Sequence, residues 1–168
     1  MVFDNVLSKV FNNKFSFDEI IIDEDVINSI IYYSKEAYPN EFLAFFDGKL
    51  KGNKLLISSL LFLPNDSSST GASFNGTLFP PNQKIWGTVH SHPGPSAMPS
   101  DADLMTFRKH GIFHMILCLP YSVPTMRGYN AYGESTTFKI GKVSDNNHDV
   151  MLDDLEEIRN QIEDEENR

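Results

Sequence analysis

The chain has 168 residues, of which 40% are hydrophobic and 22% charged, so it suits one folded domain with a substantial core and is not a disordered chain. Its 23 acidic residues exceed its 14 basic residues and give a formal net charge of −9, which disfavours nucleic acid and anionic membranes as partners. One cysteine excludes an intramolecular disulfide, and the sequence leads us to expect neither secretion nor membrane insertion. We expect a cytoplasmic protein with a single domain over residues 1–168 and a core over about 15–143.

The first part of the sequence predicts a helix followed by a hairpin. Residues 15–22 mix apolar and polar side chains and favour a short strand or an extended lead-in. After Asp23, apolar residues at helical spacing predict an amphipathic helix. Two apolar runs, 41–46 and 54–63, lie on either side of the turn signal Asp47-Gly48. We expect a hairpin that turns at this dipeptide.

The second part of the sequence predicts strands, a helix and then an acidic tail. The long aperiodic stretch 64–83 is expected to be a functional or mobile loop. The apolar stripe in the acidic tail 149–168 predicts a final helix that packs on the body or forms a homodimer contact. This order of elements predicts an α/β fold of the α+β type, with a mixed central sheet flanked by helices. The intervening expected elements are strands over 84–92, 112–119, 125–132 and 136–143 and a helix over 101–109.

The candidate site begins at the end of the 84–92 strand. His90 and His92 project from the same face there, because successive side chains alternate along a strand. Ser100, a candidate helix N-cap, follows His92 after seven intervening residues, and Asp103 follows one helical turn later. A rigid, Pro-rich connection can fold the start of this helix back onto the two histidines. The spacing His-x-His-x7-Ser-x2-Asp therefore predicts that two imidazoles and one carboxylate converge.

Three nitrogen and oxygen ligands are typical of a catalytic zinc site. They leave a fourth tetrahedral position for water, whereas calcium and magnesium prefer more oxygen ligands. Hydrolysis of an amide also needs a group that takes a proton from water and delivers it to the departing amine. We therefore expect a further carboxylate outside the ligand set.

Together with Glu41, the motif His90-Ser91-His92-Pro93 followed by Ser100 and Asp103 resembles the JAMM (MPN-plus) zinc metalloproteases. The resemblance extends over about residues 23–140 and implies a cytidine-deaminase-like MPN fold with one Zn²⁺ per chain. It implies that His90, His92 and Asp103 ligate the zinc. It also implies that Glu41 holds the zinc-bound water as general base, while Ser100 hydrogen-bonds the developing oxyanion.

The resemblance also implies a class of substrate. JAMM enzymes resemble peptidases that cut the bond after the C-terminal Gly-Gly of ubiquitin-like proteins. This chain, with its single small domain, is similar to stand-alone archaeal and bacterial members of the family. We expect a desampylase-like or deubiquitinase-like isopeptidase whose partner is a ubiquitin-like modifier or its conjugates, with the 64–83 loop beside the substrate groove. Two alternatives are a processing peptidase for a sulfur-carrier protein and a non-catalytic MPN scaffold. The bulky Phe42 after Glu41 departs from the family pattern and raises the question of whether it narrows the site.

Three other reactive residues are expected to have structural roles. His110 and His114 are four residues apart, but Gly111 breaks the helix between them, so shared ligation is not expected. We expect His110 to cap the helix and His114 to be a packed or surface residue. Cys118 lies in an apolar strand and is expected to be a small buried hydrophobic residue.

Overall fold

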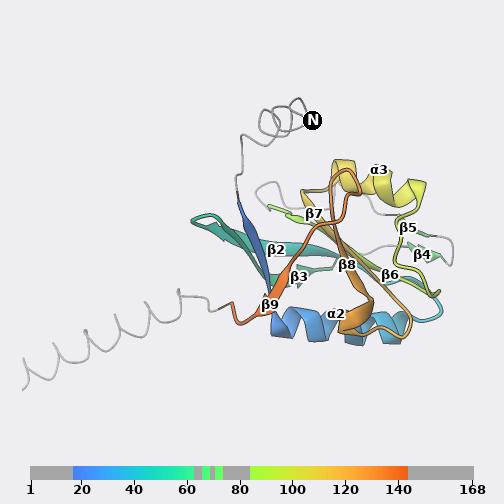
Figure 1. Ribbon diagram of the computed structural model, residues 1–168. Coiled ribbons are helices and arrows are strands. Elements are labelled where there is room, and N and C mark those ends of the chain that lie inside the picture. Colours follow the sequence, from blue (N-terminus) through green and yellow to red (C-terminus); the bar gives the residue numbers. More distant parts are fainter. Residues whose placement is uncertain (1–16, 63–65, 69–70, 74–83, 144–168) are drawn as a thin grey trace, which may run out of the picture.

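The computed structural model describes residues 17–62, 66–68, 71–73 and 84–143 (Figure 1). Within these ranges the chain forms a seven-stranded sheet with helices α2 and α3 on opposite sides of it and a separate two-stranded hairpin. The helices are α2 (Glu24–Ala37) and α3 (Asp101–Lys109), and a short 3₁₀ helix covers Val123–Thr125. The strands are β1 (Glu19–Asp23), β2 (Leu43–Lys51), β3 (Lys54–Leu61), β4 (Asp66–Ser68), β5 (Gly71–Ser73), β6 (Gly87–His92), β7 (Phe113–Cys118), β8 (Met126–Asn130) and β9 (Lys139–Gly141).

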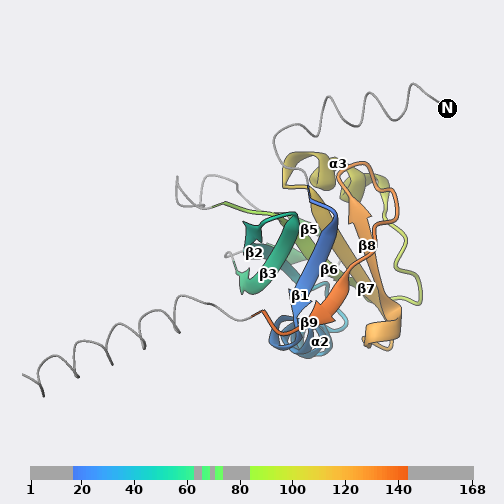
Figure 2. The same cartoon turned by 60° about the vertical axis from the view of Figure 1, so that its left-hand side comes forward.

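The large sheet is mixed and curled. Its strand order is β8-β7-β6-β2-β3-β1-β9, with parallel pairing of β6 to β7 and of β1 to both β3 and β9. After β8 the chain first returns along this strand, where the Thr136 N–H donates to the Gly128 carbonyl at 2.8 Å. It then pairs as β9 with β1 at the other end of the strand order, which requires the sheet to curl (Figure 2). This arrangement confirms the predicted mixed sheet flanked by helices.

Apolar side chains fill both sides of the sheet. Asp23 caps α2 by accepting a hydrogen bond from the Asp25 N–H at 2.9 Å, and the helix then buries Val26, Ile27 and Ile30. Each such burial contributes about 1.5–3 kcal/mol. On the other side of the sheet, Phe107 of α3 packs with Ile116 and Tyr129 in a second, smaller cluster.

The predicted hairpin between the first two apolar runs is present, but its predicted turn is wrong. Strand β2 continues through Asp47-Gly48 with a change of register, and the chain turns at Gly52-Asn53, where Gly52 has a φ of 60°. The Asp47 carboxylate accepts hydrogen bonds from the Gly48 N–H and the Ser59 hydroxyl, both at 2.9 Å. A Cβ on Gly48 would lie 2.0 Å from the Leu56 carbonyl oxygen, so this glycine permits a close approach of two strands.

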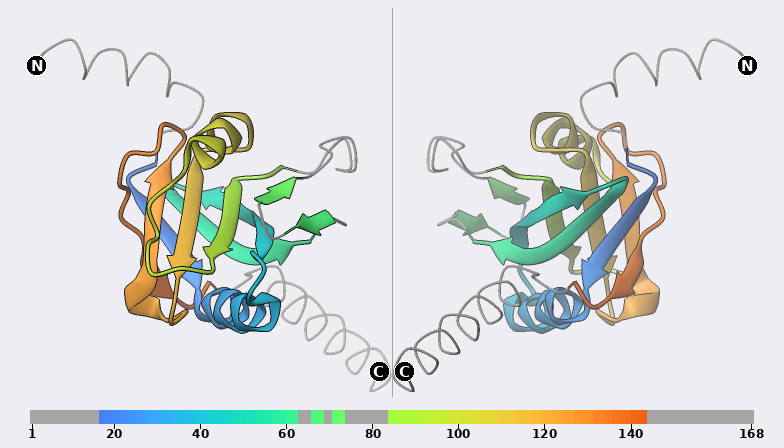
Figure 3. Two further views of the ribbon diagram at one scale, coloured as in Figure 1. Left: turned by 90° about the vertical axis from the view of Figure 1, so that its right-hand side faces the viewer. Right: turned by 90° about the vertical axis from the view of Figure 1, so that its left-hand side faces the viewer.

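The other predicted helices and strands differ from the observed ones mainly in the residues at which they begin and end. The lead-in predicted over 15–22, of which residues 15 and 16 lie outside the described ranges, overlaps β1, which runs from Glu19 to Asp23. The stretch 64–83, expected to be a loop, contains the β4–β5 hairpin, which projects to one side of the large sheet (Figure 3). The final helix predicted over 149–168 lies outside the described residues. Within the described ranges, no helix combines the length and apolar character needed to cross a bilayer.

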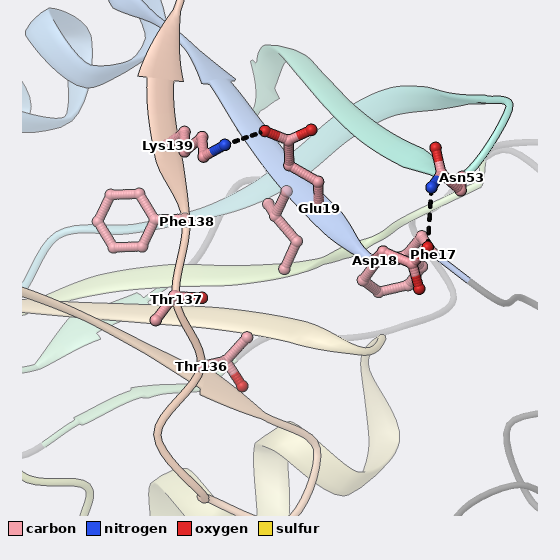
Figure 4. Close-up of a pocket in the computed structure, with 9 residues that line it drawn as sticks. Phe17, Asp18, Glu19, Asn53, Thr136, Thr137, Phe138 and Lys139 are labelled. Carbon is pink, nitrogen blue, oxygen red and sulfur yellow. Dashed lines mark hydrogen bonds and ion pairs between the residues drawn. The ribbon is translucent and has the colours of Figure 1, made fainter.

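A cavity of about 580 Å³ lies beside the paired ends of β1 and β9 (Figure 4). Glu19 forms ion pairs at this edge with Lys139 and, at 2.9 Å, with Lys54. The lining residues are Phe17, Asp18, Glu19, Ile20, Asn53, Thr136, Thr137, Phe138 and Lys139. Because the lining includes none of the predicted site residues, this cavity is not the predicted catalytic site.

Candidate metal centre

The two histidines lie at the end of β6, in the middle of the sheet. β6 pairs with β2 on one side and with β7 on the other, so its backbone is fixed by both neighbours. His90 and His92 share one face, as the strand alternation predicts, and their Nε2 atoms lie 3.1 Å apart. The ring of His90 lies 6.3 Å from the ring of Phe107, which places both histidines on the α3 side of the sheet.

The Pro-rich connection brings the start of α3 back to the histidines. The Gly94 carbonyl accepts a hydrogen bond from the Leu119 N–H at 3.0 Å, and the Ala97 carbonyl accepts one from the Tyr129 hydroxyl at 2.7 Å. The loop is therefore tied to the end of β7 and to β8. A further contact joins His92 Nδ1 to the Ser96 carbonyl at 3.0 Å. Because a carbonyl only accepts hydrogen bonds, Nδ1 carries the proton in neutral His92 and Nε2 keeps its lone pair.

Asp103 completes the cluster from the first turn of α3. Its Oδ1 lies 3.0 Å from His90 Nε2, and its Oδ2 lies 3.4 Å from His92 Nε2. The same Oδ2 accepts hydrogen bonds from the Ser100 N–H and the Ser100 hydroxyl, both at 2.7 Å. In return the Asp103 N–H donates to Ser100 Oγ at 3.2 Å, which makes a capping box. Ser100 thus caps α3, as predicted, and orients the carboxylate.

The donor set fits a zinc ion. The three donor atoms are two imidazole nitrogens and a carboxylate oxygen, and they lie within 4.8 Å of one another. Ligand atoms about 2.0–2.1 Å from a tetrahedral zinc are about 3.3–3.4 Å apart, close to the 3.0–3.4 Å separations of the closest site atoms. His90, His92 and Asp103 can therefore hold Zn²⁺.

The cluster is partly buried, and the contacts among its side chains shift the pKa values of Asp103 and His92. Burial raises the pKa of the Asp103 carboxyl, but the hydrogen bonds from His90 and His92 outweigh it and hold this pKa far below its usual range. The hydrogen bond to Asp103 raises the pKa of His92, while burial opposes this change. The carboxylate is therefore ionised at neutral pH, as a metal ligand must be.

Glu41 lies two residues before the start of β2, the strand that pairs with β6. Leu43, the first residue of β2, is the register partner of His90, and the Ser91 N–H still donates to the Phe42 carbonyl at 3.0 Å. Continued by one more residue, this register would set Glu41 beside His92. Directly opposed residues of an antiparallel pair share one face, so Glu41 would lie on the face of the histidines. Its negative charge also contributes to the raised pKa of His92, after the larger effects of Asp103, burial and Ser96. The predicted catalytic residue is thus close enough to act electrostatically on His92.

Phe42 does not narrow this site. Its ring is buried in the core on the α2 side of the sheet and stacks on Tyr33 with ring centroids 5.8 Å apart. The strand alternation that turns Glu41 toward the histidines turns Phe42 away from them.

The other reactive residues are structural, as the sequence predicts. His110 is the C-cap residue of α3, and Cys118 is buried at the end of β7. His114 is fully buried, and its Nδ1 lies 3.2 Å from the Thr88 N–H and 2.8 Å from the Thr88 hydroxyl. Burial lowers the pKa of His114 to about 3, and nearby backbone carbonyls oppose the shift only in part.

His114 should make the fold sensitive to acid. The unfolded chain binds a proton there near pH 6.5, but the folded chain binds it only near pH 3. The contribution of His114 to stability is therefore complete above pH 6.5 and is lost as the pH falls, by up to about 1.4 kcal/mol per pH unit. Urea unfolding between pH 7.5 and 5 should show a shallower loss of stability for His114→Asn, which places an acceptor near the position of Nδ1 but does not titrate. Equal slopes for the two proteins would contradict this expectation.

Comparison with known proteins agrees with this geometry. The family of prokaryotic homologues of the JAB domain matches residues 23–132. A probable metalloprotease of Haloferax volcanii is 28% identical over 120 residues, which cover 67% of this chain and 74% of the relative.

Solved structures of related domains extend this agreement to the fold. A structure described as a JAMM metalloprotease-like zinc site in the proteasome and signalosome is 30% identical, with a TM-score of 0.58 over 74% of this chain and 100% of the other. A JAB1/MPN domain protein from Archaeoglobus fulgidus is also 30% identical, with a TM-score of 0.59 over 74% and 99%. A Desulfitobacterium hafniense protein with 17% identity shares the fold, with a TM-score of 0.60 over 77% and 97%. The chain belongs to the prokaryotic JAB family, and so to the JAMM zinc metalloproteases.

Proposed function

We propose that this protein is a zinc-dependent isopeptidase that hydrolyses the bond after the C-terminal Gly-Gly of a ubiquitin-like modifier. The observation that carries the proposal is the convergence of His90, His92 and Asp103 beside Glu41 in a chain of the JAMM family. Zinc held by these three ligands would polarise the scissile carbonyl and lower the pKa of a bound water.

Glu41 is the proton carrier in this proposal. The register of β2 with β6, continued to Glu41, would bring its carboxylate to the face of the ligands, where it would accept a proton from the attacking water. It then delivers that proton to the amine nitrogen of the departing lysine, so the carboxylate is ionised again at the end of the cycle. Ser100 is assigned to the developing oxyanion, toward which its hydroxyl can turn from Asp103 Oδ2.

Exposed aromatic side chains near Glu41 support a folded protein as substrate. Tyr33 and Phe62 are 41% and 50% exposed, and both rings lie within about 6 Å of Phe42, the residue after Glu41. Large apolar groups gathered at a surface are typical of protein contacts. This surface lies on the α2 side of the sheet, whereas the histidines lie on the α3 side. We assign it to the body of the modifier, whose extended tail would then pass around the start of β2 to reach Glu41.

The proposal is tested with zinc-loaded protein and a panel of Gly-Gly-tailed ubiquitin-fold proteins. Each is offered in two forms, joined to a lysine side chain or extended by a residue through a peptide bond. Intact-mass analysis should show release of a modifier with a free Gly-Gly carboxylate from the lysine conjugate. Cleavage of the extended form alone would replace the proposal by sulfur-carrier processing. Cleavage of neither form by protein with one zinc per chain would overturn it in favour of a scaffold.

A further inference from the structure

We propose that Ser91, the residue between the two histidines, is a positioning residue that fixes Glu41 next to the metal centre, and that Tyr121 supports it from behind. This inference goes beyond the proposed function, because it concerns how the chain holds its catalytic carboxylate, and it rests on the assignment of Glu41 as proton carrier.

The first observation is a reciprocal pair of hydrogen bonds between Ser91 and Phe42. The Ser91 N–H donates to the Phe42 carbonyl at 3.0 Å, as in an ordinary antiparallel ladder. The Phe42 N–H donates to Ser91 Oγ at 2.9 Å, so a side chain takes the place of the backbone acceptor expected in such a pair. Both residues are buried, so no water is at hand to replace this acceptor.

The second observation is where this contact lies in the chain. Phe42 follows Glu41 directly, and Ser91 lies between His90 and His92. The Ser91 side chain points to the α2 side of the sheet, away from the ligands, so it touches neither the metal donors nor the substrate face. The Ser91 hydroxyl thus joins two segments near the site. In one segment Phe42 is bonded directly to Glu41, and in the other Ser91 is bonded directly to His90 and His92.

The third observation is the phenol of Tyr121. This residue is buried, and among the described residues its hydroxyl has no partner at full hydrogen-bonding distance. Burial raises the pKa of Tyr121, and a longer interaction with the Ser91 side chain opposes that rise. Tyr121 also has a φ of 57°, a left-handed conformation that is unusual for a bulky residue. The left-handed turn after β7 therefore brings a buried phenol within range of the Ser91 side chain.

The experiment compares Ser91→Ala with wild type in the zinc-loaded full-length protein. Amide hydrogen exchange of Phe42 should be at least tenfold faster in the variant, because its N–H loses its acceptor. With a cleavable conjugate, kcat should fall at least tenfold while KM and the zinc dissociation constant stay within twofold. Ser91→Thr, which keeps the hydroxyl, should restore both the exchange rate and kcat.

Two further variants keep the test decisive. Ser34→Ala removes the hydroxyl of an equally buried serine on α2, whose Oγ has no hydrogen-bond partner among the described residues, and should change neither exchange nor kcat. Tyr121→Phe removes one oxygen and should lower kcat about threefold if the phenol supports Ser91. Unchanged Phe42 exchange in Ser91→Ala, or a loss of zinc that accounts for its lost activity, would overturn the inference. If no conjugate is cleaved by wild type, the proposed function fails, while the exchange measurement still tests the contact.

Discussion

Glu41→Gln should lower kcat by about a thousandfold while zinc stays at one per chain. Glutamine has nearly the same shape as glutamate but cannot accept and return a proton at neutral pH, and general acid–base catalysis is worth about 10²–10⁴ in rate. The residue precedes β2 and is not part of the donor cluster, so metal binding should not depend on its charge. Steady-state cleavage at saturating concentrations of a lysine conjugate, with elemental analysis of the same enzyme sample, measures both quantities.

Glu36 provides the matched control for this experiment. It is the neighbouring glutamate in the sequence, but it is exposed on α2 rather than beside the cluster. Glu36→Gln should therefore cleave at the wild-type rate. Full activity in Glu41→Gln would remove Glu41 from the mechanism.

His90→Ala should abolish stoichiometric zinc binding and activity together. Removing one of three protein ligands leaves two, too few for a stable catalytic zinc site, and opens a gap in a cluster whose donors are 3.0–3.4 Å apart. Elemental analysis after zinc supplementation should give about one zinc per chain for wild type and almost none for the variant. Zinc should also raise the Tm of wild type but not of the variant, because only a folded site gains from the bound ion.

His110→Ala is the control for the loss of an imidazole in general. His110 ends α3 away from the donor cluster, so this variant should keep its zinc. If wild type takes up no zinc after supplementation, the site is a relic and the scaffold alternative becomes the leading interpretation.

The metal donors could be predicted because their placement depends on local rules. Alternation along a strand puts His90 and His92 on one face, and an N-cap followed by one helical turn puts Asp103 beside Ser100. The loop between them could be recognised as rigid, although its ties to β7 and β8 could not be predicted. Local rules therefore account for most of the candidate site.

The parts that sequence reasoning missed depend on pairing between distant segments. Asp47-Gly48 is a turn signal, yet a strand bulge with a close backbone approach has the same local preference, and only the pairing of β2 with β3 decides between them. Likewise, the contact of Ser91 with Phe42 joins residues 49 positions apart. The inward direction of Phe42 follows from the register between β2 and β6, which no local motif in this sequence specifies.

The double use of the Asp103 carboxylate changes how related sequences should be interpreted. The two oxygens of this carboxylate lie against the histidines, and one of them also accepts the Ser100 N–H in the capping box of α3. A descendant that loses catalysis would still be selected to keep Ser100 and Asp103, because the helix needs its cap. A related sequence that keeps only Ser100 and Asp103 then shows selection for the fold. Loss of the two histidines is what would indicate that such a protein is no longer a catalyst.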